Sequence, residues 1–328
     1  MSWLHIRNAT VYAPEEMGIQ DVLCWEGRIV SIGPDLSPPI FAKPRTLDAK
    51  ERILLPGLID AHIHIMGSSG SRGPSDRLSD LPLSRITAAG VTTVVSPLGT
   101  DSLSRSLSGL LMRASAATEE GITAYVYTGG WANPVSTLTG DPQTDVIYLD
   151  RVLGIKVAIA EPSAPPFSVD QLAQLAHASV IGGRIAGKQT VLHAHVGDRP
   201  EGLQPLWEAT LQTGLPMDRF VATHVNRTPQ LYQQSLDYAR AGGSIDFTAK
   251  ARPDSGYGQA LLPEQAILAA LDDGVSQERI TLSSDSGATY PTPNGTGKHM
   301  AGPSGVFNTL SEIVNEGHTG MRQSPWRL

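Results

Sequence analysis

Hydrophobic and polar positions follow two different patterns along the chain. Up to Pro56, short apolar runs are separated by turn residues, a pattern typical of β-strands. After Pro56, apolar runs rich in β-branched residues alternate with longer segments of helical period, which indicates buried parallel strands joined by helices. The pattern therefore predicts a small β unit followed by a larger α/β unit.

Each unit can be divided further. In the first, Glu26-Gly27 between two apolar runs is a hairpin signal, and the strand-like runs are residues 4–11, 22–25, 28–32 and 46–55. In the second, eight candidate strands cover residues 58–65, 91–98, 123–128, 152–160, 190–196, 220–225, 243–248 and 280–284. Helix-like segments include residues 103–120, 169–182, 229–241, 263–273 and 304–316. Eight such units predict a (β/α)8 TIM-like barrel.

Composition narrows the class of protein. Hydrophobic residues make up 40% and charged residues 17% of the 328 positions, which favours a folded chain. The net charge of −7, without blocks of like charge, argues against nucleic acid or an anionic membrane as partner. Cys24 is the only cysteine, so an internal disulfide and a cysteine-based zinc site are excluded. We expect a cytoplasmic protein, because neither a signal peptide nor an apolar run of about 18 residues is evident.

Polar side chains interrupt the predicted strands or follow them. Catalytic groups of barrels lie at the carboxyl ends of the strands, where residues distant in sequence meet. The residues in such positions are His62, His64, Lys156, His193, His195, His224 and Asp285.

Several of these residues are typical metal ligands. His62 and His64 are two positions apart on a predicted strand, so both imidazoles lie on one face and can bind one cation such as Zn²⁺. His-x-His alone is a weak signal, but His195, His224 and Asp285 at later strand ends strengthen it.

Lys156 lies in an otherwise apolar strand, where a buried ammonium is costly. One interpretation is a lysine that reaches the rim or pairs with a carboxylate. The more specific interpretation is that burial lowers the pKa of the lysine, so that it is a neutral amine. Such an amine can be carboxylated by CO₂ and bridge two metal ions.

The first barrel strand carries a recognisable motif, Leu55-Pro56-Gly57-Leu58-Ile59-Asp60-Ala61-His62-Ile63-His64. It resembles the first-strand signature of the amidohydrolase superfamily. Within it, the chain is most similar to the metallo-type isoaspartyl (β-aspartyl) dipeptidases. The supporting segments, in family order, are residues 89–95, 98–101, 120–125, 150–156, 195–198, 223–227 and 282–285.

The resemblance implies a dipeptidase-like metallopeptidase with two zinc ions. His62 and His64 would bind one ion, His195 and His224 the other, and carboxylated Lys156 would bridge them. A metal-bridging hydroxide would attack the amide, with Asp285 as metal ligand and acid/base. His193 has no ligand role in the family, so we expect a packed or supporting histidine there. The implied partner is a small amide or dipeptide, and we expect a homo-oligomer.

The substrate side only partly follows the family. Arg227 matches the position that holds a substrate carboxylate, and Thr100 and Thr289 match polar contact positions. Three other positions depart from the family: Ser71 replaces a glutamate that grips the substrate ammonium, Trp131 replaces a tyrosine, and Ser163 replaces an arginine. Hydrolysis is therefore better supported than β-aspartyl specificity. A cyclic amide, as in hydantoinases and dihydroorotases, or an N-acyl amino acid stays open as substrate.

The end of the chain also departs from the family. The predicted limits are residues 1–56 for a small β-sandwich-like domain, 57–317 for the barrel and 318–328 for an irregular tail. The C-terminal β segment that would complete the small domain is missing, which predicts exposed apolar edges and lower stability. A truncated, non-catalytic barrel is the alternative from another class of protein.

Overall fold

The computed structural model describes residues 2–13, 15–68, 73–290, 299–300 and 303–316. The first of its two compact units ends at Gly57, and the second spans Leu58–Glu316. Two predicted features, Ser71 and the tail of residues 318–328, lie outside the described residues.

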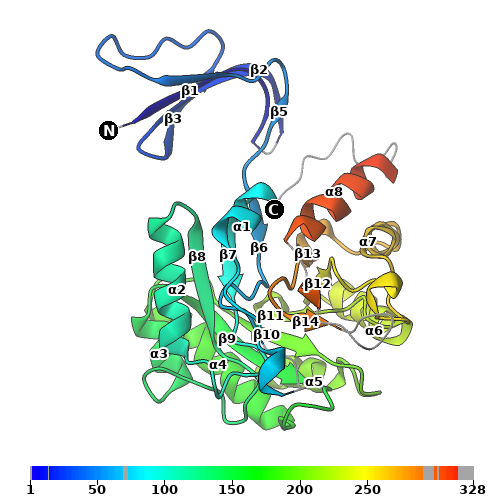
Figure 1. The fold of residues 1–328 in the computed structure, drawn as a ribbon. Helices are drawn as coiled ribbons and strands as arrows, with labels where there is room; N and C mark the ends of the chain where they lie inside the picture. Colours follow the sequence, from blue (N-terminus) through cyan, green and yellow to red (C-terminus); the bar gives the residue numbers. More distant parts are fainter. Residues whose placement is uncertain (1, 14, 69–72, 291–298, 301–302, 317–328) are drawn as a thin grey trace. The chain divides into compact units, whose positions relative to one another are not determined.

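The first unit is a five-stranded sheet (Figure 1). Its strands are β1 (Trp3–Tyr12), β2 (Glu16–Trp25), β3 (Arg28–Gly33), β4 (Arg45–Asp48) and β5 (Ile53–Leu54). Their order is β3-β2-β1-β4, with β5 also paired with β1. Glu26 and Gly27 both have positive φ, 49° and 74°, as a tight hairpin turn requires. Ala9, Val11 and Val22 form the buried core of this unit.

The second unit contains eight parallel strands in sequential order. They are β6 (Leu58–Asp60), β7 (Val91–Ser96), β8 (Thr123–Gly129), β9 (Val152–Ile159), β10 (Val191–Val196), β11 (Phe220–Thr223), β12 (Ser244–Thr248) and β13 (Ile280–Ser283). A short antiparallel pair, β14 (Thr289–Tyr290) and β15 (His299–Met300), follows.

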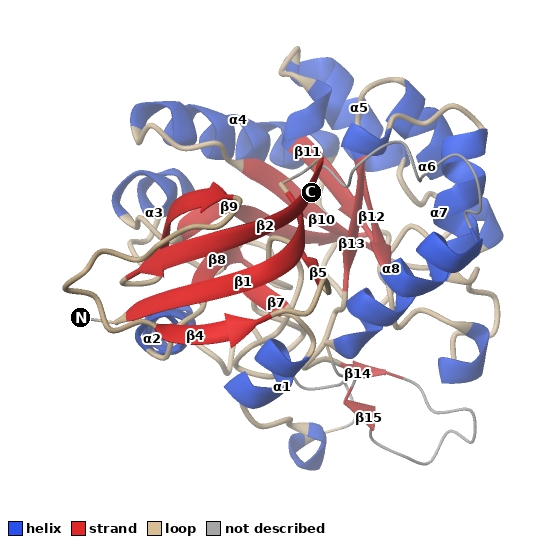
Figure 2. Ribbon diagram, turned by 90° about the horizontal axis from the view of Figure 1, so that it is seen from above, coloured by secondary structure: helices blue, strands red, loops and turns tan. Residues whose placement is uncertain are grey.

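Helices lie between the strands, and Figure 2 shows α3 to α7 on the outside of the eight-stranded sheet. They are α1 (Leu83–Ala88), α2 (Leu107–Glu119), α3 (Pro142–Tyr148), α4 (Val169–Ile185), α5 (Gln204–Thr213), α6 (Pro229–Arg240), α7 (Pro263–Asp272) and α8 (Ser304–Glu316). The 3-10 turns are η1 (Pro74–Asp76), η2 (Met217–Arg219), η3 (Pro253–Ser255) and η4 (Gln277–Arg279). Within the described residues, no helix has the length and apolarity needed to cross a membrane.

The ends of the first and last barrel strands are joined by hydrogen bonds. The amide of Ser284 donates to Asp60 Oδ1 at 3.1 Å, and the amide of Asp285 donates to the carbonyl oxygen of His62 at 2.9 Å. The amide of His64 donates to the carbonyl oxygen of Ser286 at 2.8 Å. These bonds nearly close the sheet, and the predicted (β/α)8 barrel with a small N-terminal β unit is confirmed.

The first barrel strand is shorter than predicted. It ends at Asp60, so His62 and His64 follow the strand instead of lying on it. The reason is that their backbone groups bond to Asp285 and Ser286 after β13, where the barrel closes.

Candidate metal centre and active site

The predicted ligands gather at the carboxyl ends of five barrel strands. Two follow β6, one lies on β9, one on β10, one follows β11 and one follows β13. All are at most 9% exposed: His62, His64, Lys156, His195, His224 and Asp285. Residues separated by more than 200 positions in sequence are therefore brought into one buried group.

The tightest part of this group is a triad. One ligand atom from each of His62, His64 and Asp285 lies within 4.8 Å of the others. Asp285 Oδ1 is 3.6 Å from Nε2 of His62 and 3.2 Å from Nε2 of His64. Two imidazoles and a carboxylate at this spacing form a donor set that suits a borderline divalent cation.

A second pair of histidines adjoins the triad. The ring centroids of His195 and His224 are 4.5 Å apart, and those of His62 and His224 are 5.0 Å apart. Lys156 Nζ lies 5.8 Å from the centroid of the Trp131 ring, which itself contacts His195 at 4.6 Å. The lysine thus lies beside the ring that touches the second histidine pair.

Burial controls the charge of these groups. Desolvation lowers the pKa of His62, His195 and His224 well below its ordinary value, so the imidazoles are neutral, as metal ligands must be. Desolvation also lowers the pKa of Lys156 to about 8. Burial alone would raise the pKa of Asp285, but the Lys250 ammonium and the His64 hydrogen bond hold it well below its usual range.

The second ring nitrogen of each histidine has its own partner. In three rings this nitrogen is Nδ1: it lies 2.9 Å from His193 Nε2 in His62, 3.2 Å from the Pro97 carbonyl oxygen in His64, and 2.6 Å from Thr248 Oγ1 in His224. These contacts direct Nε2 of His62 and of His64 toward Asp285, the third member of the triad. In His195 the roles are reversed, because Nε2 lies 3.1 Å from Glu161 Oε2.

Two members of the group have strained backbones. His224 has φ of 73° and Asp285 has φ of 50°, in the left-handed region that non-glycine residues rarely adopt. Such strain persists where the surrounding structure over-determines the conformation, and it is frequent at functional sites.

Sequence reasoning missed two charged residues of the site. Lys250 Nζ lies 2.9 Å from Asp285 Oδ2 and donates to the Asp285 carbonyl oxygen at 3.0 Å. Glu161 contacts His195. Both follow closely after a barrel strand, β12 and β9 respectively, and that position was the available signal.

Arg227 lies at the edge of the second histidine pair. Its Nη2 donates to Asp198 Oδ2 at 2.9 Å, and its Nη1 is 3.8 Å from Glu161 Oε2. Nη1 is also 3.3 Å from His195 Nε2. The guanidinium is therefore held by two carboxylates next to the candidate metal ligands.

The other predicted substrate residues are less closely grouped. The Trp131 indole N–H donates to the Ser163 carbonyl oxygen at 3.2 Å, so this donor already has a protein partner. Thr100 is exposed after β7, and Thr289 is half-buried at the start of β14.

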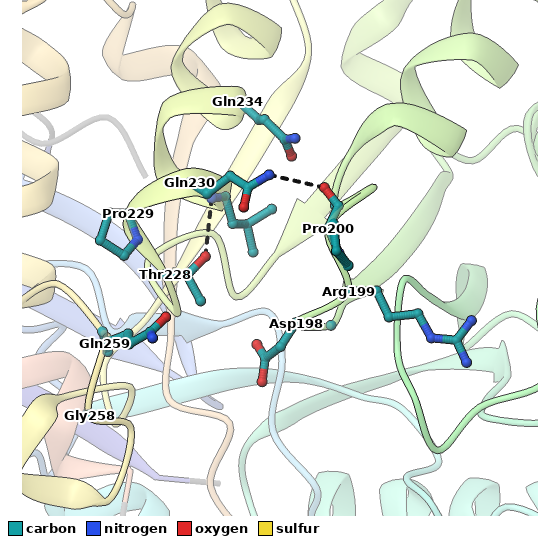
Figure 3. Close-up of a pocket in the computed structure, with 13 residues that line it drawn as sticks. Asp198, Arg199, Pro200, Thr228, Pro229, Gln230, Gln234, Gly258 and Gln259 are labelled. Carbon is teal, nitrogen blue, oxygen red and sulfur yellow. Dashed lines mark hydrogen bonds between the residues drawn. The ribbon is translucent and has the colours of Figure 1, made fainter.

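A pocket of about 630 Å³ lies between the loop after β10 and the start of α6 (Figure 3). Asp198, the ion-pair partner of Arg227, lines it together with Thr228 and Gln259. Gln230 also lines it and donates to the Pro200 carbonyl oxygen at 3.1 Å, which ties the start of α6 to the loop after β10. The pocket wall therefore mixes polar and apolar groups, and Asp198 connects it to Arg227.

Comparison with known proteins agrees with this geometry. No protein-family profile matches the sequence. The chain is 32% identical over 109 residues to an imidazolonepropionase from Methylobacterium nodulans. The aligned segment covers 32% of this chain and 27% of that protein. It is 37% identical over 62 residues to adenine deaminase 1 of Latilactobacillus sakei. That aligned segment covers 19% of this chain and 9% of the deaminase. The matches thus span about a quarter or less of these two relatives' own lengths.

Solved structures give a longer match. The β-aspartyl dipeptidase of Fervidobacterium islandicum AW-1, solved in complex with β-Asp-Leu, has a TM-score of 0.86 and 31% identity, covering 97% of this chain and 82% of that one. A D-hydantoinase structure has a TM-score of 0.62 and 18% identity, and the match covers 87% of this chain and 68% of the hydantoinase. This likeness shows the common fold alone.

The barrel and the buried histidine–aspartate group define an enzyme of the amidohydrolase superfamily. At 31% identity over most of both chains, this chain belongs to the family of β-aspartyl dipeptidases within that superfamily. The family resemblance inferred from the sequence is thereby confirmed.

Proposed function

We propose that this protein is a zinc-dependent hydrolase of small amide bonds and that β-aspartyl dipeptides are its first substrate class. The observation that supports the proposal most directly is Lys156, a lysine 1% exposed in the same barrel mouth as four histidines and an aspartate. A buried ammonium is costly, and groups with strongly shifted pKa values gather at functional sites.

The donor set fits two metal ions. A lysine with a pKa of about 8 is partly a neutral amine at physiological pH, so Nζ can attack CO₂ and form a carbamate with loss of one proton. The proposed ligands are His62 and His64 for one ion, His195 and His224 for the other, carboxylated Lys156 as the bridge, and Asp285.

Asp285 is suited to acid–base work. When bound, the two ions would lower the pKa of water and polarise the scissile carbonyl. Because Asp285 is ionised at neutral pH, its carboxylate can accept the proton of the attacking water. The same carboxyl then donates that proton to the leaving amine, which restores the starting state of the side chain.

Arg227 is the proposed anchor for a substrate carboxylate. A guanidinium can bind both oxygens of a carboxylate, and this one lies 3.3 Å from His195. Asp198 and Glu161 hold Arg227 in position, so the incoming carboxylate would join or displace one of them. The pocket lined by Asp198 then offers room for the side chain of the leaving residue.

A second candidate substrate class follows from the substrate-side replacements. The Trp131 donor is engaged by the Ser163 carbonyl oxygen, and Ser163 itself lacks the charge of the family's arginine. These differences favour a cyclic amide or an N-acyl amino acid as the competing substrate.

The proposal is tested by measuring hydrolysis of β-aspartyl dipeptides, N-acyl amino acids and hydantoins. The full chain is loaded with zinc in the presence of bicarbonate, and Asp285→Asn is the matched control. We expect turnover of β-Asp-Leu and a loss of about 10²–10⁴-fold in kcat in the variant, the range of general acid–base catalysis.

Other outcomes have distinct meanings. Turnover of hydantoins or N-acyl amino acids alone would move the specificity to the competing class. No turnover by a folded, zinc-loaded protein would contradict the proposal and favour the non-catalytic barrel.

A further inference from the structure

Glu161 follows β9 closely and is not among the ligands proposed above. The chain turns sharply before it, since Ala160 has φ of 49°. The Glu161 side chain is 13% exposed, and its Oε2 lies 3.1 Å from Nε2 of His195. Glu161 therefore makes a nearly buried contact with a proposed metal ligand.

The neighbouring chain holds Glu161 in place. Ser163 donates to Glu161 Oε1 from its amide at 3.2 Å and from its hydroxyl at 2.9 Å. The loop after β10 approaches so closely that a Cβ at Gly197 would clash with the Ala160 carbonyl oxygen. The amide of Arg199 donates to that same oxygen at 2.9 Å. Glu161 and the end of the His195 strand are thus fixed against each other.

The contact determines which nitrogen of His195 carries the proton. A carboxylate only accepts hydrogen bonds, so Nε2 must carry the N–H that faces Glu161. Nδ1 then keeps its lone pair and becomes the ligand atom. His64 differs, because its Nδ1 faces the Pro97 carbonyl oxygen and its Nε2 faces Asp285 at 3.2 Å.

Arg227 raises a competing interpretation. Its Nη1 lies 3.3 Å from the same Nε2 and could donate to it if Nε2 lacked a proton. A lone pair on Nε2 would then face the Glu161 carboxylate at 3.1 Å, which is repulsive. The Arg227 charge is already balanced by Asp198 and Glu161, so the protonated Nε2 is the better arrangement.

We infer that Glu161 is a positioning residue that orients His195 for metal binding through Nδ1, and that Ser163 supports Glu161 in this role. The inference depends on the proposed function, because it assigns His195 to a bound ion. Ser163 occupies the position of a substrate-binding arginine of the family, and in this chain it holds the Glu161 carboxylate by two hydrogen bonds.

The test compares zinc retention in four full-length proteins: wild type, Glu161→Ala, Glu161→Gln and Asp198→Asn. Each is loaded with zinc, dialysed, analysed for zinc content and titrated with a competing chelator. Glu161→Ala is expected to weaken binding of one of two ions by about 10–100-fold, the usual effect of removing such a partner. Glu161→Gln is expected to recover most of it, because the amide oxygen can accept the same hydrogen bond.

Asp198→Asn is the matched control. It also removes a carboxylate from Arg227 but makes no contact with His195 among the described residues, so both ions should be retained. If Glu161→Ala folds poorly, Ser163→Ala provides the milder variant, and an intermediate loss of zinc is expected.

Two outcomes overturn the inference in different ways. Equal zinc affinity in wild type and Glu161→Ala, with only KM raised, would mean that Glu161 contacts substrate instead. Failure of the wild-type protein to bind zinc would overturn the proposed function and this assignment together.

Discussion

Lys156 illustrates how a single residue can oppose folding and serve function. It is 1% exposed, and desolvation lowers its pKa from 10.5 to about 8. Between these two values the unfolded chain binds more protons than the folded chain. The stability contributed by this group therefore rises with pH across that window and is lowest below about pH 8.

We predict that Lys156→Met stabilises the metal-free, CO₂-free protein while it removes zinc binding and activity. Replacing a buried charge by an apolar side chain of similar size should raise the free energy of unfolding at pH 7 by about 1–3 kcal/mol. The gain should shrink toward pH 10.5. Urea unfolding of both proteins at several pH values measures the difference.

Lys43→Met serves as the control for this experiment. Lys43 is exposed, so its replacement should change stability by no more than about 0.5 kcal/mol. A Lys156→Met protein that is less stable at pH 7, or whose gain is independent of pH, would contradict the argument.

Residues of the candidate site differ in how visible they are in the sequence. Lys156 and the histidines stand out because polar groups interrupt apolar strands. Glu161 and Lys250 lie in loops, where charged residues are ordinary. Only the fold reveals that one lies 3.1 Å from His195 and the other 2.9 Å from Asp285.

At the scale of elements, the strands were easier to predict than the helices. All eight barrel strands were predicted, because buried parallel strands are continuous apolar runs. Helices α1, α3 and α5, of six, seven and ten residues, were not among the predicted segments; the two shortest have too few turns to give a clear period. The short β6 was overextended, because its continuation bonds to the loop after β13 instead of extending the strand.

Asp246 on β12 links the strands on either side of it. Its Oδ2 accepts hydrogen bonds from Thr223 and Ser283, each at 2.6 Å, and its Oδ1 accepts one from Thr281 at 2.7 Å. Burial raises the pKa of this carboxyl to about 6. Its contribution to stability therefore falls as pH rises from 3.8 to about 6.

We predict that Asp246→Ala lowers the free energy of unfolding by about 3–5 kcal/mol, because buried hydroxyl groups on both neighbouring strands lose their acceptor. Thr281→Val, which removes one of the three bonds, should cost about 1 kcal/mol. Urea denaturation at pH 7 measures both. Equal effects of the two variants would contradict the prediction, because the bonds from Thr223 and Ser283 would then add nothing to stability beyond the bond from Thr281.

For the whole molecule, the sequence predicts the barrel better than it predicts the substrate. Strand ends meet in any closed barrel, so the meeting of residues 62, 156, 195, 224 and 285 could be expected. Substrate choice depends on loop contacts, such as that between Trp131 and Ser163, which no sequence pattern encodes.

Metal binding should stabilise the barrel as a whole. The proposed ligands come from the first strand end, at His62, through to the last, at Asp285, and the unfolded chain cannot hold them together. Zinc at about 1,000 times its Kd adds about 4 kcal/mol. For a unit of this size we therefore predict a rise in Tm of about 5–15 °C over chelator-treated protein. Calorimetry with and without zinc, on the wild type and on a His62→Asn, His64→Asn double variant, tests this expectation. The variant should lose most of the rise, whereas an equal rise in both proteins would mean that zinc binds elsewhere on the chain.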